Sequence, residues 1–71
     1  MLEKIGNNIR MVRKSLNIKV DDVSLAIDIS TKNIYAIERG ERIGKNFIKY
    51  LVFLNSKKVN LNTLFPSKLD T

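Results

Sequence analysis

The side chains able to carry out chemistry in this sequence are carboxylates, hydroxyls and lysines, because its 71 residues include no Cys and no His. Disulfides, zinc fingers, cysteine nucleophiles and imidazole general bases are therefore excluded. The one adjacent acidic pair, Asp21 and Asp22, lies where the sequence predicts the start of a helix, and acidic side chains there interact favourably with the positive end of the helix dipole. We interpret this pair as structural, and we expect no enzymatic activity, no metal or cofactor, and no small-molecule ligand.

The cationic side chains offer a different chemistry, the electrostatic binding of a polyanion. Thirteen Lys and Arg residues against seven Asp and Glu residues give a net charge of +6 and a pI near 9.9. This charge suits a partner such as nucleic acid. Net charge does not establish that partner by itself, so the question is whether the folded chain gathers cations on the face that it would present to a phosphate backbone.

The size and composition predict one small, mostly helical domain over residues 1–71. A chain of this length buries only about 60% of the surface that its unfolded form exposes, which leaves little room for a second site. Hydrophobic residues make up 44% of the chain, with three Gly and one Pro, so disorder is not indicated. No apolar run approaches the roughly 18 to 20 residues of a membrane span, and the N-terminus lacks the features of a signal peptide. We expect a cytoplasmic protein with no membrane contact.

Apolar residues at steps of three and four predict two helices in the first part of the chain. The first stripe runs from Leu2 to Leu16, and Asn17 follows it as a residue that tolerates the left-handed conformation found at helix ends. The second helix begins near Lys19 or Val20 and covers two turns before Asp28 breaks the pattern. The chain therefore opens with two helices separated by a short connection.

The third predicted helix has the clearest boundaries. Ser30 can accept hydrogen bonds from the free amides of the first turn as an N-cap, and Gly40 closes the helix as a C-cap. At about 100° per residue, its side chains divide into two faces. The face expected in the core contains Asn33, Ile34, Ile37 and Glu38. The other face is polar with one aromatic ring and contains Thr31, Lys32, Tyr35, Ala36 and Arg39.

The last part of the chain is predicted to close the domain. The segment from Phe47 to Leu54 is apolar almost all round, which is typical of a helix that is central or pressed against a partner. A short fifth helix is expected from about Asn60 to Phe65, ended by Pro66, with residues 67–71 frayed. The inward-facing residues of this helix would be Leu61, Leu64 and Phe65.

Together these residues resemble the Cro and phage-repressor type of helix-turn-helix proteins, an Xre-like DNA-binding family, from Ile5 to Phe65. Members have an arginine in the first helix, a small residue at the fifth position of the second helix, a turn, a recognition helix ending in Ile-Glu-x-Gly, and a terminal Leu-Phe. The matching positions here are Arg13, Ser24, Asp28, Ile34 with Ile37-Glu38-Arg39-Gly40, and Leu64-Phe65. The resemblance implies an all-α, five-helix, lambda-repressor-like domain whose helix-turn-helix spans about residues 20–40.

Two positions depart from the family pattern. The turn residue, which is usually Gly, is Asp28, and aspartate tolerates the left-handed conformation better than most other non-glycine residues. The second helix opens with Val20 rather than the usual Gln, so only a backbone amide can bind a phosphate there. The small side chain of Ser24 keeps to the pattern and suits the close approach of two helices across a short turn.

The resemblance also implies which residues would read DNA bases. The third helix, residues 31–39, would enter the major groove, and its base-reading positions would be Thr31, Lys32 and Ala36. Lys32 would donate to guanine O6 and N7. Thr31 would donate a hydrogen bond or touch a thymine methyl group, and Ala36 would make only an apolar contact.

Positive and polar side chains on this helix and beside it would bind phosphates. These are Lys19, Tyr35, Arg39, Arg42 and Lys45. The alternative for Tyr35 is a ring that shields neighbouring apolar atoms while its hydroxyl stays in water. A separate pair, Arg13 and Glu38, would form a partly buried structural ion pair between the first and third helices.

Two functions stay open from the sequence. The first is a sequence-specific transcriptional regulator, acting as a repressor, that binds double-stranded DNA as a homodimer, because one domain of this size contacts too few bases for high specificity. The second is an antitoxin or adaptor that uses the same fold chiefly to hold a protein partner. Tyr50, Val52 and Phe53 lie away from the apolar stripe of the fourth helix, so they could form that partner surface, the dimer interface, or packing under the first and last helices.

Overall fold

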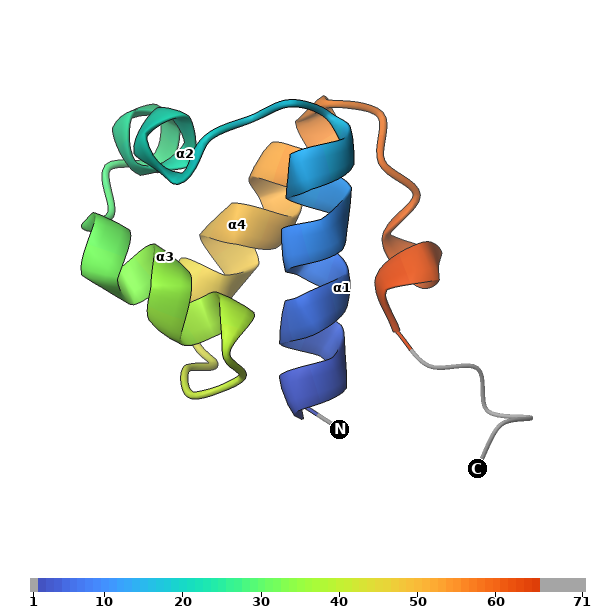
Figure 1. The fold of residues 1–71 in the computed structure, drawn as a ribbon, viewed down its shortest axis with the longest axis horizontal. Coiled ribbons are helices and arrows are strands. Elements are labelled where there is room, and N and C mark those ends of the chain that lie inside the picture. The colour runs from blue at the N-terminus through green and yellow to red at the C-terminus, as the bar shows by residue number, and fades with distance from the viewer. Residues whose placement is uncertain (1, 66–71) are drawn as a thin grey trace.

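The computed structural model describes residues 2–65, which fold into four α-helices and one turn of 3-10 helix (Figure 1). These elements are α1 (Leu2–Ser15), α2 (Val20–Ile27), α3 (Thr31–Glu38), α4 (Lys45–Ser56) and the 3-10 helix η1 (Leu61–Leu64). No strand occurs in this part of the chain, which confirms the all-α class. The count of five helices is not met, because residues 61–64 complete only a single 3-10 turn. The segment expected to be frayed, residues 67–71, lies outside the described residues.

The apolar stripe of α1 faces the rest of the domain. Ile5 and Ile9 are buried and Val12 is half-buried, as the periodicity predicts. The helix ends at Ser15, and Leu16, expected as the last member of the stripe, is exposed. The described part of the buried stripe therefore runs from Ile5 to Val12.

Each α-helix is followed by a residue in the left-handed conformation. These residues are Asn17 (φ 59°), Asp28 (φ 56°), Gly40 (φ 77°) and Lys58 (φ 68°). In each case the next amide N–H donates to a carbonyl of the last helical turn, as when the N–H of Ile18 donates to the carbonyl oxygen of Arg13 at 3.1 Å. The sequence predicts the first three as helix ends. It does not predict Lys58, because lysine has no marked preference for this conformation.

Side-chain hydrogen bonds hold the turn between α2 and α3. The hydroxyl of Ser24 donates to the carbonyl of Ile29, across the point where the two helices approach. Ser30 Oγ accepts a backbone N–H from the first turn of α3, as expected of the N-cap. At the start of α2, the carboxylate of Asp22 accepts the backbone N–H of Lys19 at 3.2 Å. One member of the acidic pair therefore caps a helix, as the structural interpretation requires.

α3 packs against α1, α2 and α4. Figure 1 shows α1 in front of α4, with α2 and α3 to one side of α1 and η1 to the other. Asn8 fixes η1 to α1, because its Nδ2 donates to the carbonyl oxygen of Leu64 at 2.8 Å. Phe65, expected to face inward, is 41% exposed, so that prediction is wrong. The buried core draws on every element and contains Ile5, Ile9, Val20, Val23, Ile29, Ile34, Ile37, Phe47, Tyr50, Leu54 and Leu64.

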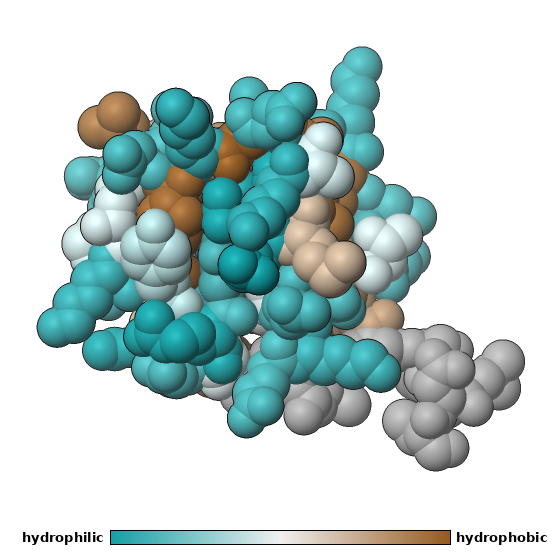
Figure 2. Space-filling model, in the orientation of Figure 1, coloured by the Kyte–Doolittle hydropathy of each residue, from teal (hydrophilic) through white to brown (hydrophobic). Residues whose placement is uncertain are grey.

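The surface combines a hydrophilic covering with a few exposed apolar side chains. On the face shown in Figure 2, polar side chains cover most of the surface, while some hydrophobic side chains lie in recesses between them and a few project outward. The large apolar side chains with the greatest exposure are Leu25 (83%), Ile43 (68%) and Val52 (62%). No helix within residues 2–65 has the length and apolar character needed to cross a membrane.

α1 and the end of α3 approach each other closely at Gly6. A Cβ atom at this position would lie 2.5 Å from the carbonyl oxygen of Glu38 and 2.6 Å from that of Ile37. Both contacts are with backbone atoms, so no side-chain rotation can relieve the clash. The two helices can pack at this distance only because the residue is glycine.

We expect Gly6→Ala to destabilise the fold by about 1 to 3 kcal/mol, the usual cost of overpacking. This loss would appear although alanine favours helix formation over glycine by about 1 kcal/mol. Lys4→Ala, at an exposed position of α1, is the matched control and should change stability little. Urea denaturation followed by circular dichroism measures both variants, and a Gly6→Ala variant as stable as the wild type would contradict the close approach.

Candidate functional site

Three buried polar side chains fix the end of α3. Arg13 donates from Nε to Glu38 Oε2 at 2.7 Å and from Nη2 to Glu38 Oε1 at 3.1 Å. The hydroxyl of Tyr50 donates to Glu38 Oε2 at 2.6 Å, and Arg13 Nη1 donates to the carbonyl oxygen of Ile18 at 2.9 Å. The side chains of Arg13 and Glu38 are only 7% and 2% exposed. We call Arg13, Glu38 and Tyr50 the buried triad, and it joins α1, α3 and α4.

The structure thus brings together the two residues expected to pair and adds a third that the sequence did not assign to them. Tyr50 is fully buried. Of the places that the sequence left open for it, the partner surface and the dimer interface are therefore wrong, and it packs inside the domain. One signal in the sequence pointed to its role: it is a tyrosine in the middle of a helix that is otherwise almost entirely apolar. A buried tyrosine hydroxyl needs a hydrogen-bond partner.

The electrostatics of the buried triad favour a charged Arg13 and a neutral Tyr50. Hydrogen bonding to the Glu38 carboxylate raises the pKa of Arg13. Burial raises the pKa of Tyr50 above its usual value, and the adjacent Glu38 raises it further. No buried side-chain nitrogen or oxygen in the described residues lacks a hydrogen-bond partner. The members of the triad therefore satisfy one another, and the cluster is structural.

The opposite side of α3 faces solvent. Lys32 and Arg39 are exposed, Tyr35 is 49% exposed and Thr31 is half-buried; we call these four residues the outward face of α3. Ala36 was expected on this face but is only 5% exposed, so its predicted base-reading position is wrong. The four side chains of the outward face span about 100° of the helix circumference, and Ala36 lies about 40° beyond their edge, on the side toward the core.

Three further cations expected to bind phosphates are exposed on the segments beside α3. Lys19 immediately precedes α2, Arg42 lies in the loop after α3, and Lys45 is the first residue of α4. The N-cap of α4 is Gly44, which has no side chain to satisfy the first backbone amides of the helix. These amides, together with the nearby side chains of Arg42 and Lys45, form an environment that favours an anion.

Arg39, also expected to bind a phosphate, is paired with Glu41. Its Nε donates to Glu41 Oε2 at 2.7 Å and its Nη2 donates to Oε1 at 3.1 Å. These hydrogen bonds raise the pKa of Arg39 and lower the pKa of Glu41. Both side chains are more than half exposed, so water and salt weaken the pair. A phosphate can therefore replace Glu41 at little cost.

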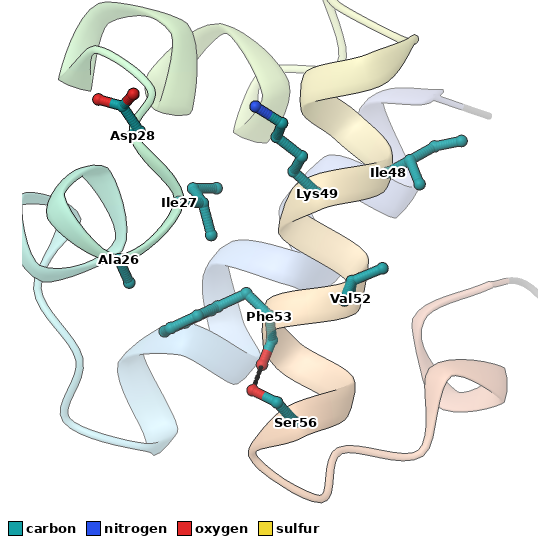
Figure 3. Close-up of a pocket in the computed structure, with 8 residues that line it drawn as sticks. All are labelled: Ala26, Ile27, Asp28, Ile48, Lys49, Val52, Phe53 and Ser56. Carbon is teal, nitrogen blue, oxygen red and sulfur yellow. Dashed lines mark hydrogen bonds between the residues drawn. The ribbon is translucent and has the colours of Figure 1, made fainter.

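α2 and α4 border an apolar groove of about 540 Å³ (Figure 3). Val52 lines its α4 side and is 62% exposed, whereas Phe53 is half-buried and reaches from α4 toward α2. Of the three residues expected to form a partner surface, only these two are accessible. The mostly apolar lining suits another protein surface better than a small charged ligand.

The described residues offer no site for a metal ion, since no three His, Cys, Asp or Glu side chains in residues 2–65 gather closely enough to hold one. No protein-family model, curated protein or solved structure matches this chain. The geometry of α3 and of the segments beside it therefore carries the functional conclusion.

Glu38→Ala should lower the melting temperature far more than Glu41→Ala. Removing Glu38 leaves the charge of Arg13 and the hydroxyl of Tyr50 buried without their partner, which typically costs about 3 to 5 kcal/mol at a deeply buried ion pair. Removing Glu41 breaks a pair that is already solvated. Thermal unfolding followed by circular dichroism compares the two variants, and equal melting shifts would rule out a structural role for the buried triad.

Tyr50→Phe should destabilise the fold by about 1.5 to 3 kcal/mol near neutral pH, because a hydrogen bond to a charged acceptor is lost. This difference should shrink as the pH rises above about 10. The pKa of Tyr50 is raised in the folded state, so the tyrosine of the unfolded wild type ionises first and favours unfolding, an effect that the phenylalanine variant lacks. Urea denaturation of both proteins from neutral pH to about pH 11 measures the difference. A constant difference across this range would contradict the prediction.

Proposed function

We propose that this chain is a helix-turn-helix DNA-binding protein, a sequence-specific transcriptional regulator that acts as a repressor and binds double-stranded DNA as a homodimer. In this proposal, α2, the turn over residues 28–30 and α3 form the helix-turn-helix of a lambda-repressor-like domain. The observation that carries the proposal is the division of α3 into two sides. The buried triad holds one side, and the other presents the polar and cationic side chains of the outward face.

This division suits a helix that reads DNA. Such a helix needs a fixed orientation together with side chains that are free to contact bases. An α-helix with its side chains is about 10 to 12 Å in diameter, which fits the major groove of about 12 Å width. The buried triad lies at the C-terminal end of α3, away from the N-terminal end, which contacts base edges in helix-turn-helix proteins.

The outward face supplies three side chains for contacts with bases. Lys32 would donate to guanine O6 and N7, and Thr31 would contact thymine or donate a hydrogen bond. Because Ala36 is buried, the middle of the outward face belongs to Tyr35 instead. Tyr35 would therefore lie against a base or the phosphate beside it, in addition to the phosphate contact expected from the sequence.

Cations around the outward face would bind the DNA backbone. Lys19, Arg42 and Lys45 are exposed, and Arg39 becomes available when a phosphate replaces Glu41. Each phosphate that a cation neutralises releases bound counterions. Four such contacts predict that log K falls against log salt with a slope of about −3 to −4 for each bound copy.

Selection of binding sites from a random duplex pool tests this function. The wild type should enrich one half-site, and Lys32→Ala should lose its base preference at one position of that half-site. Lys57→Ala is the matched control, because it removes the same charge from the far end of α4 and should leave the half-site unchanged. The affinity of the wild type for the selected duplex should also follow the salt dependence given above.

The outcome separates this function from its alternative. An antitoxin or adaptor that uses the same fold to hold a protein partner is favoured by one observation, the exposed apolar groove between α2 and α4. Absence of any enriched half-site, together with partner binding in the absence of DNA affinity, would support the alternative. Salt-dependent duplex binding that needs no partner would exclude it as the main function.

A further inference from the structure

The groove between α2 and α4 is an apolar surface that contact with DNA leaves unused. In Figure 3, α4 lies in front, the ring of Phe53 reaches toward Ala26 on α2, and Ile27 points into the space between the two helices. Ile48 and Val52 also line the groove and are 58% and 62% exposed. Exposed apolar side chains that share one recess are typical of a surface that another protein covers.

The two edges of this groove carry opposite charges. On the α2 edge, residues 20–28 contain three acidic residues and no basic one, and Asp28 lines the groove. On the α4 edge, Lys49 lines the groove, and α4 contains no acidic residue. In the described part of the chain, neither Asp28 nor Lys49 forms an ion pair. Both charges are therefore available to a partner.

We propose that this groove binds a second copy of the chain about a two-fold axis that passes close to Val52. Under this axis, the acidic edge of one copy lies over the basic edge of the other, and Asp28 of each copy faces Lys49 of the partner subunit. The exposed side chains of Ile48 and Val52 from the two copies meet at the centre of the interface and cover both grooves.

The distribution of charge favours a second copy over a different partner. A two-fold interface brings a surface patch against itself, so a patch of one sign would repel its own copy. A patch that is acidic on one side, apolar in the middle and basic on the other becomes complementary to itself after a two-fold rotation. An acidic partner would match only the α4 edge, and a basic partner would match only the α2 edge. The net charge of +6 opposes association at low salt, but physiological salt screens it.

This interface deepens the proposed function and rests on it in one respect, because a palindromic DNA site requires two copies. The interface and the DNA-reading surface do not compete for residues. None of the four residues of the outward face lines the groove, so one copy can bind its partner while the outward face stays open to DNA.

Sedimentation equilibrium of the full chain without DNA tests the interface. From about 1 μM to about 1 mM, the wild type should show a reversible monomer–dimer equilibrium, as expected of a small interface. Val52→Asp should weaken it by about tenfold or more, because the charge would be buried twice in each dimer. Ile43→Asp, at an equally exposed apolar residue outside the groove, should leave the equilibrium unchanged. Circular dichroism confirms that each variant is folded, and Ile48→Asp repeats the test at a second position.

A charge exchange tests the two-fold arrangement itself. Lys49→Glu and Asp28→Lys should each weaken self-association by about tenfold or more, because each homodimer then contains two like-charge pairs. An equimolar mixture of the two variants should recover wild-type association, because the mixed dimer contains two opposite-charge pairs. Lys58 already adopts a φ of 68° in this chain, so a lysine is compatible with the left-handed turn at Asp28.

A wild-type chain that stays monomeric at about 1 mM would overturn the interface. So would a dimer that neither groove variant weakens, a mixture that shows no recovery, or a monomer that takes up only an acidic or a basic peptide in the groove. The DNA measurements fail separately from these. A dimer that binds no duplex would leave the interface standing and remove the proposed DNA binding. A monomer with salt-dependent duplex binding would remove the interface and the homodimer and leave DNA binding standing.

Discussion

The buried carboxylate of Glu38 is the acceptor on which the remainder of the fold depends, because it receives hydrogen bonds from two helices that lie far from it in the sequence. Arg13 reaches it from α1 and Tyr50 reaches it from α4. α3 has only eight residues, too few for a stable helix on its own, so it is helical because its neighbours hold it. If some of its hydrogen-bond donors were missing, the free energy lost by burying the carboxylate would exceed the free energy gained from the remaining hydrogen bonds. The three helices therefore have to come together as a unit.

The position of this cluster separates two tasks within one short helix. Glu38 lies at the last residue of α3, where Gly6 also allows α1 to approach the backbone. The outward face begins at the opposite end, with Thr31 and Lys32. In the proposed function, the residues that orient the helix are thus different from the residues that read DNA. The cations on neighbouring segments add affinity without taking part in either task.

Local signals in the sequence identify most helix boundaries, because capping residues such as Ser30 and left-handed residues such as Asp28 act within one turn. The burial of a side chain and its contacts with other helices are harder to predict from the sequence. The periodicity of α3 indicates the direction of each side chain around the helix axis. It does not indicate how much of the helix circumference the neighbouring helices cover. Ala36 points only about 40° beyond the outward face, and this difference places it in the core. Tyr50 and Gly6 owe their roles to atoms of α3 that are distant in the sequence. The residues proposed to read DNA stay predictions, since they follow from exposure and resemblance.

The close approach at Gly6 has an evolutionary consequence. The packing of α1 on α3 uses none of the outward-face side chains, so Thr31, Lys32 and Tyr35 can be exchanged while the helix keeps its place. Descendants of this chain are then free to diverge quickly at those positions and, in the proposed function, to adopt new target sequences. At Gly6, in contrast, a hydrogen atom is the only side chain that fits. A search pattern built on Gly6 and the buried triad should therefore find distant relatives that a comparison of surface residues would miss.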